Sequence, residues 1–169
     1  MTDAIARIET EVAMLLRLAD RNRRTGDVLE HALDRSAYLL LRLLTERGPT
    51  NVNALAGLLR LDPSTVTRQL LAMEADGLVV RGRDPQDGRG TLVTATDDGV
   101  RALAATRAAR AEVYADVLDG WSEADRSTLA DLLARLNADL DLRSRRQSAG
   151  QSAGSVATRP VRSPSGSPT

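Results

Sequence analysis

Apolar residues recur at steps of three and four along most of the chain, which is the spacing of one face of an α-helix. The first such stretch spans residues 3–24, and arginines at its C-terminal end followed by Gly26 predict where it stops. Its apolar stripe consists of Ile5, Ile8, Val12, Leu15, Leu16 and Ala19. A helix with so apolar a face needs a surface to pack on, either its own domain or a second copy of the chain.

A second helical stretch covers residues 28–47, with a break near Asp34 and a Gly-Pro pair at its end. Its stripe is Leu33, Ala37, Leu40, Leu41 and Leu44. A short helix over residues 54–60 is expected next, with Asn53 as its N-cap. Gly57 inside this helix costs up to ~1 kcal/mol relative to alanine, so tertiary packing must hold it. Its inward residues are expected to be Leu55, Leu58 and Leu59.

The following helix begins at Asp62, a favoured N-cap, with Pro63 at the first helical position and an Asp-Gly pair at residues 76–77 to end it. The residues expected to face inward are Val66, Leu70 and Met73. Those left nearer the outer face are Ser64, Thr65, Thr67, Arg68 and Leu71.

Two strand-like runs, residues 78–81 and 91–95, flank a segment rich in Pro, Asp and Gly at residues 83–90. Two short helices, a tight turn and an arginine-tipped hairpin within residues 49–94 together predict a winged helix-turn-helix. Sequence-specific DNA binding is therefore the first functional hypothesis.

Two more helices are expected after the hairpin. Thr96 and two acids begin one that runs to about Leu118, and residues 122–125 form a capping-box pattern at the start of the last. The apolar side of the first is marked by Val100, Leu103, Tyr114 and Val117. The stripe of the last is Leu129, Leu132, Leu133, Leu136 and Leu140.

The final segment, residues 144–169, changes in composition, because half of its 26 residues are Ser, Gly or Pro. We expect it to be disordered, since nothing in it can bury a core. Its arginines either add weak attraction to DNA or belong to an inert tail.

Composition narrows the function. The chain has no Cys and a single His, His31, so disulfides, thiol chemistry and His-based metal clusters are excluded. Apolar runs are at most as long as residues 37–41, which is far too short for a membrane span. We expect a cytoplasmic protein that is not an enzyme and carries no cofactor. The net charge of zero conceals an asymmetry: residues 36–96 carry seven Arg and six acids, whereas residues 97–142 carry five Arg and ten acids.

The sequence Leu-Asp-Pro-Ser-Thr-Val-Thr-Arg from residue 61, Glu-x-x-Gly-Leu-Val from residue 74 and the Asp-x-x-Asp-x-Arg hairpin ending at Arg89 resemble the MarR family of transcriptional regulators. The likeness covers about residues 5–142. It implies a mainly α fold with a small β-hairpin wing, in which residues 1–35 and 97–143 form dimerisation helices around a DNA-binding domain at residues 36–96. It also implies a homodimer on an inverted repeat and a small-molecule effector bound between the two regions.

Candidate DNA contacts follow from the chemistry of each side chain. The hydroxyls of Ser64, Thr65 and Thr67 can reach phosphates or base edges, or they can simply cap the helix locally. Arg68 can chelate guanine O6 and N7, or it can be a solvated helix arginine. Asn53, at a helix start, lies where backbone N–H groups attract phosphate.

Other candidates lie in the hairpin, on the helix that begins at Asp62 (the recognition helix of a helix-turn-helix), and near the N-terminal part of the chain. The resemblance implies that Arg89 enters the minor groove. Asp84 or Asp87 can pair with Arg89 and hold it extended, and Arg83 is a second wing candidate that we expect to contact a phosphate. Leu71 lies where members of the family often carry a polar residue, and it either touches a thymine methyl or packs. The remaining candidate, His31, either lines an effector pocket or lies at the surface.

The expected function is a homodimeric, sequence-specific transcriptional regulator, a repressor released by a small molecule. The alternative is a winged-helix module for protein contacts without specific DNA binding. The presence of Arg68 and Arg89 argues against that alternative.

Overall fold

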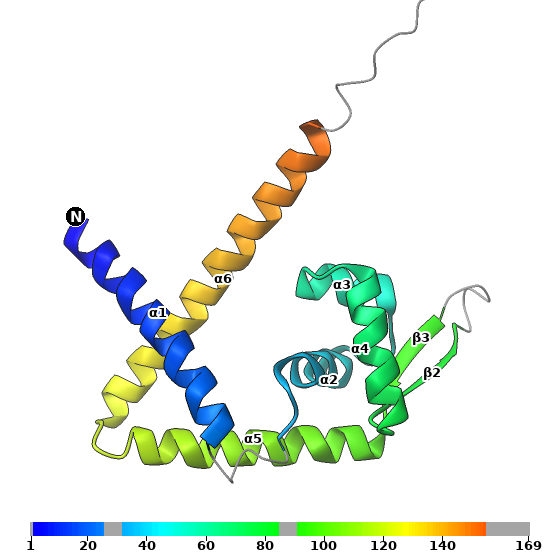
Figure 1. Cartoon of the computed structure of the whole chain (residues 1–169), viewed down its shortest axis with the longest axis horizontal. Helices are drawn as coiled ribbons and strands as arrows, with labels where there is room; N and C mark the ends of the chain where they lie inside the picture. The colour runs from blue at the N-terminus through cyan, green and yellow to red at the C-terminus, as the bar shows by residue number, and fades with distance from the viewer. Residues whose placement is uncertain (1, 26–31, 85–90, 155–169) are drawn as a thin grey trace, which may run out of the picture. The chain divides into compact units, whose positions relative to one another are not determined.

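The computed structural model describes residues 2–25, 32–84 and 91–154, and it is mainly helical with one small sheet, as expected (Figure 1). The chain divides into two units, residues 1–119 and 120–169. In chain order the elements are α1 Thr2–Thr25, α2 Arg35–Arg47, β1 Thr50–Asn51, α3 Val52–Leu59, α4 Pro63–Ala75, β2 Val79–Arg83, β3 Thr91–Ala95, α5 Asp97–Val117 and α6 Glu123–Gly154.

Helix α2 supplies the centre of the core. Its N-cap is Asp34, whose carboxylate accepts a hydrogen bond from the Ala37 backbone N–H at 2.8 Å, so the predicted break is the point where this helix begins. The predicted stripe is confirmed, because Ala37, Leu40, Leu41 and Leu44 are buried and Leu33 is partly buried just before the helix. Fully buried side chains from the neighbouring elements complete the core: Leu55, Val66, Leu70, Val79 and Val93.

Helix α3 begins two residues earlier than predicted. The N-cap is Asn51, which accepts from the Ala54 N–H at 2.8 Å, so the assignment of Asn53 as the cap is wrong. Asn51 belongs to strand β1, and its extended backbone is the conformation that an N-cap requires. Asn53 lies exposed in the first turn of the helix. Of the three leucines expected inside, Leu55 is buried and Leu58 and Leu59 are partly buried.

The sheet has three strands in the order β1-β3-β2, and every pairing is antiparallel. Strands β2 and β3 form the expected hairpin, with Val79 opposite Ala95 and Arg83 opposite Thr91. Strand β1 was not predicted, because two residues are too few to show the alternation of a strand.

Helix α5 is fixed to the end of α4 by Thr96, the predicted N-cap. Its hydroxyl accepts from the Gly99 N–H at 3.0 Å and donates to the Gly77 carbonyl at 2.7 Å. Of the apolar side predicted for α5, only Leu103 is buried. The other three members are at least 42% exposed: Val100, Tyr114 and Val117.

Helix α6 has the predicted capping residue, since Ser122 accepts from the Asp125 N–H at 3.1 Å. The helix continues to Gly154, so the prediction that disorder begins at residue 144 is wrong for residues 144–154. Once a helix is nucleated, each further residue adds a hydrogen bond, and the Arg145–Asp141 ion pair at 2.8 Å supports this part. Residues 155–169 lie outside the described part of the chain.

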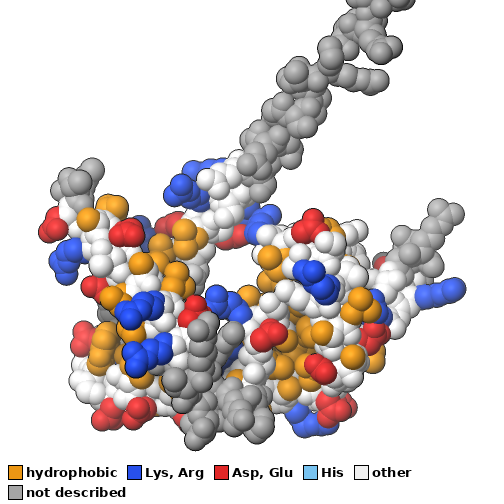
Figure 2. Space-filling model, viewed as in Figure 1, with side chains coloured by type: hydrophobic (Ala, Val, Ile, Leu, Met, Phe, Trp, Pro, Cys, Tyr) orange, Lys and Arg blue, Asp and Glu red, His pale blue; other side chains and the backbone are white. Residues whose placement is uncertain are grey.

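The stripes of α1 and α6 lie at the surface of the single chain. On α1 the exposed apolar side chains include Ile5, Ile8, Leu15 and Leu16, and apolar side chains of this helix are visible on the face shown in Figure 2. On α6 the exposed leucines are Leu132, Leu133, Leu136, Leu140 and Leu142.

Among the glycines in the described part of the chain, Gly99 should be the one least tolerant of a side chain. A Cβ there would lie 2.1 Å from the Leu78 carbonyl oxygen and 2.9 Å from Leu41 Cδ2, so Gly99→Ala should destabilise the fold by at least ~1–3 kcal/mol through overpacking. Thermal unfolding at fixed protein concentration measures this as a fall in Tm.

The matched control for this prediction is Gly57→Ala. Apart from its chain neighbours and the backbone of its own helix, no described atom lies within 4 Å of a Cβ at residue 57, and alanine favours the helix by up to ~1 kcal/mol, so the Tm should rise. A Gly99→Ala protein as stable as the wild type would contradict the packing of α5 on Leu41 and Leu78.

Candidate nucleic-acid interface

The outer face of α4 carries the predicted base-reading residues. Burial of Val66, Leu70 and Met73 confirms which side of the helix faces the core. Ser64 and Arg68, four residues apart, are exposed on the opposite side, and Thr65 and Thr67 are half-buried. The Thr67 hydroxyl donates to the Pro63 carbonyl at 2.8 Å, so its proton is held within the helix and only its oxygen is available to a ligand.

The N-termini of α3 and α4 both present backbone N–H groups that can attract a phosphate, but they differ in charge. The Asp62 carboxylate accepts from the Ser64 N–H at 2.8 Å. Hydrogen bonds from the Ser64 side chain and backbone lower the pKa of Asp62, so this group is negative at neutral pH and opposes a phosphate at the start of α4. The cap of α3 is the neutral amide of Asn51, which leaves its N-terminus better suited to an anion.

An ion pair joins the recognition helix to the wing. The Arg81 guanidinium on β2 donates from Nε to Glu74 Oε2 on α4 at 2.9 Å. The hydrogen bonds between the Arg81 guanidinium and the Glu74 carboxylate lower the pKa of Glu74 and raise that of Arg81, so both groups are charged at neutral pH. No sequence signal predicted this pair, since residues 74 and 81 lie in different elements with a turn between them.

Arg83 is exposed at the end of β2, where the hairpin leaves the sheet. Asp84, proposed to position the wing, is partly buried at the same end. The remaining wing candidates, Asp87 and Arg89, lie outside the described residues. The structure thus brings the base of the wing next to α4 through the Glu74–Arg81 pair.

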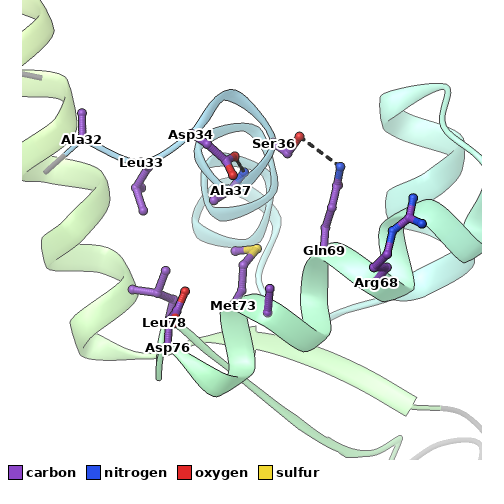
Figure 3. A pocket seen from close by; sticks show the side chains of 11 residues that line it. Ala32, Leu33, Asp34, Ser36, Ala37, Arg68, Gln69, Met73, Asp76 and Leu78 are labelled. Atoms are coloured by element: carbon purple, nitrogen blue, oxygen red, sulfur yellow. Dashed lines mark hydrogen bonds between the residues drawn. The ribbon is translucent and has the colours of Figure 1, made fainter. Parts of the chain in front are cut away.

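A cavity of about 420 Å³ lies between the start of α2 and helix α4 (Figure 3). Gln69 points across it and donates from Nε2 to Ser36 Oγ at 3.0 Å. Gln69 Oε1 is buried, and among the described residues it has no hydrogen-bond partner. Arg68 also lines this cavity, so the recognition helix carries a candidate base contact and a cavity wall on adjacent residues.

The segment that leads into α2 is anchored to α5. The Leu33 N–H donates to Thr106 Oγ1 at 3.1 Å, and Arg110 donates to the Leu33 carbonyl at 3.3 Å. The Arg110 guanidinium also lies 4.3 Å from the centre of the Tyr38 ring, a cation–π distance. Tyr38 is therefore a packing residue of this junction. His31, the effector candidate, lies outside the described residues.

The described residues hold no cluster of His, Cys, Asp or Glu that could bind a metal ion. Within the same residues, no helix is both long enough and apolar enough to cross a membrane.

A helix-turn-helix with a β-hairpin directly after its second helix defines the winged-helix class of DNA-binding proteins. The MarR family model matches residues 33–91, from the start of α2 into the hairpin. A relative from Bacillus subtilis strain 168, described as the uncharacterized HTH-type transcriptional regulator YxaD, is 41% identical over 134 residues, which cover 77% of this chain and 90% of that protein. The chain belongs to the MarR family.

Solved structures agree with this assignment. A MarR family protein from Bacillus stearothermophilus is 25% identical, has a TM-score of 0.63, and the match covers 80% of this chain and 97% of that one. The fold is also shared with the PcaV transcriptional regulator from Streptomyces coelicolor, solved with its natural ligand, at 24% identity, a TM-score of 0.60 and coverage of 75% and 89%. The protein is therefore a DNA-binding transcriptional regulator and not an enzyme.

Proposed function

We propose that this regulator is a cytoplasmic homodimer that represses transcription from an inverted-repeat operator and leaves the DNA when a small molecule binds. The observation that carries the proposal is the division of α4 into a buried apolar face and an outer face with Ser64 and Arg68. Two such helices related by a two-fold axis would lie about 34 Å apart, one turn of DNA, and so would read two half-sites of opposite orientation.

Base reading rests on Arg68. An exposed arginine in the second turn of a recognition helix can donate two parallel hydrogen bonds to guanine O6 and N7 in the major groove. Ser64 contacts the phosphate or base edge one turn earlier. Asn53, in the first turn of α3, contacts a phosphate beside the neutral N-terminus of that helix.

The wing supplies a second contact. Arg89 enters the minor groove, where a narrow A·T-rich sequence concentrates negative potential, and Arg83 at the base of the hairpin contacts a phosphate. Asp84 or Asp87 orients Arg89. The Glu74–Arg81 pair supports this arrangement, because it connects the strand that leads into the wing with the helix that enters the major groove.

A second copy of the chain covers the apolar faces of α1 and α6. Leucines and isoleucines that are 37–67% exposed recur at helical spacing on both helices, and each square ångström of apolar surface removed from water contributes about 25 cal/mol. A repeated stripe on two long helices is typical of an interface and not of scattered surface residues.

The effector occupies the cavity between α2 and α4. Its wall includes Gln69 and Arg68, whose side chains carry polar groups that can hydrogen-bond to a ligand. A ligand in this cavity would contact α4 directly. The hydrogen bonds of Leu33 with Thr106 and Arg110 also connect the wall of the cavity to helix α5. The likeness to PcaV, a regulator with a natural ligand, supports an effector of this kind. Release then follows if the ligand prefers a position of α4 that does not match the groove.

Arg68→Ala should weaken binding to a duplex selected from a random pool by about 5- to 150-fold, corresponding to ~1–3 kcal/mol, and should relax the preference for guanine at one position of each half-site. Arg89→Ala should also weaken binding strongly and leave dimerisation intact. Fluorescence anisotropy at one fixed salt concentration measures both affinities.

The control is Arg101→Ala, which removes an exposed arginine of α5 that pairs with Asp98 and takes no part in the proposed interface. Failure of the wild type to select any sequence would favour the alternative, a winged-helix module for protein contacts. An Arg68→Ala protein with unchanged affinity and base preference would remove the assignment of that residue.

Leu133→Glu together with Leu136→Glu on α6 should yield monomers, because two carboxylates would be buried in an apolar interface without partners. Analytical ultracentrifugation measures the mass. Ala138→Glu is the matched control, since residue 138 lies on the opposite face of the same helix and should leave a dimer. A monomeric wild type at micromolar concentration would contradict the proposed assembly.

Ala72→Leu should remove the response to an effector by filling the cavity that residue 72 lines, while operator binding persists. The effector is first found as a compound from a metabolite library that both raises the Tm of the wild type and releases its operator. Ala75→Leu, an exposed position of α4 outside the cavity wall, should respond like the wild type. A compound that acts equally on the Ala72→Leu protein would place the effector elsewhere.

A further inference from the structure

Leu71 is an apolar residue of the recognition helix that the core does not use. Its side chain is 50% exposed, whereas the other large apolar residues of α4 are at most 3% exposed: Val66, Leu70 and Met73. It lies three residues after Arg68 and seven after Ser64, so the three residues share one face of the helix. The packing of the hydrophobic core therefore does not explain why this position is a leucine.

A single exposed leucine is ordinary on a protein surface and by itself indicates nothing. Leu71 differs in its neighbours. It extends the line of Ser64 and Arg68, the residues proposed to face the major groove, and a helical side chain leans toward the N-terminus, over the preceding turn. Leu71 thus covers the surface next to Arg68 and Thr67, in the turn of the helix that follows them.

We propose that Leu71 specifies a thymine in each half-site by contact with its C5-methyl group. This inference rests on the proposed function and deepens it. The thymine methyl is the apolar group that base pairs display in the major groove, and an aliphatic side chain beside an arginine can distinguish it from the polar edges of the other bases.

The spacing of the helix fixes where this thymine lies. Residues 68 and 71 are about 4.5 Å apart along the helix axis at ~1.5 Å per residue, and successive base pairs are ~3.4 Å apart. A helix that places Arg68 on a guanine therefore brings Leu71 within one or two base pairs of it. The expected half-site contains a thymine, on either strand, at one of those positions.

The size of the effect follows from the area of one methyl group. Burying a group of this size contributes ~0.8 kcal/mol, which corresponds to about a fourfold change in affinity. Because a homodimer makes the contact twice, removal of both methyls should weaken binding on the order of tenfold.

The test replaces thymine with deoxyuridine in the operator that the wild-type protein selects from a random pool. Deoxyuridine lacks the C5-methyl and keeps every hydrogen-bonding group of thymine. Replacing the pair of thymines adjacent to the guanine positions that Arg68→Ala relaxes should weaken wild-type binding about tenfold. Leu71→Ala should bind the thymine operator less tightly than the wild type and should bind the thymine and deoxyuridine operators equally.

Leu61→Ala is the matched control, since it truncates another exposed leucine, which precedes α4 and is not part of the helix that carries Ser64, Arg68 and Leu71. It should retain the full preference for thymine. Equal sensitivity to deoxyuridine in the wild type and Leu71→Ala, or none in either, would overturn the inference and leave the proposed function in place.

Two other results would also be informative. A wild type that selects no sequence would overturn the proposed function and this inference together. A Leu71→Ala protein that changes the monomer–dimer equilibrium, and keeps the wild-type preference for thymine, would assign the exposed leucine to a protein contact and overturn the inference.

Discussion

Attachment of α4 to the leucine core is the constraint on which the proposed interface depends. Val66, Leu70 and Met73 are buried against α2, α3 and the sheet, and a helix that buries one face must present the other to solvent. The outward positions of Ser64, Arg68 and Leu71 follow directly from that burial. Without this packing, Ser64, Arg68 and Leu71 would keep their chemistry, but their side chains would no longer be held in one orientation.

Polar contacts then set the orientation of α4 within the lobe. Asp62 caps its first turn, and Thr96 ties the glycine after its last turn to the start of α5. Along α4, Gln69 is hydrogen-bonded to Ser36 of α2, and Glu74 forms an ion pair with Arg81 of the hairpin. Half-exposed pairs of this kind add little to stability, and their effect is on the angles between the elements that meet the DNA.

The same contacts place the cavity where a ligand could act on DNA binding. Its wall contains Gln69, Arg68 and Leu33. The backbone of Leu33 is hydrogen-bonded to Thr106 and Arg110 of α5. Arginine suits both sides of this arrangement, because its planar guanidinium can chelate a base, bond to a carbonyl or stack on Tyr38. The chain has 23 arginines and no lysine, so every such contact by a long cationic side chain is made by a guanidinium.

The sequence by itself determined the helices whose apolar residues recur with a clear period and whose starts carry strong caps, such as Asp62-Pro63, Thr96 and Ser122. It also determined the family and the outward face of α4, since periodicity and local hydrogen bonds act over a few residues. Only the tertiary structure decided that Asn51 and not Asn53 caps α3, because the cap depends on the pairing of β1 with the distant strand β3. The Gln69–Ser36 bond, the Glu74–Arg81 pair and the cavity were equally hidden, because they join elements whose approach is set by the whole core.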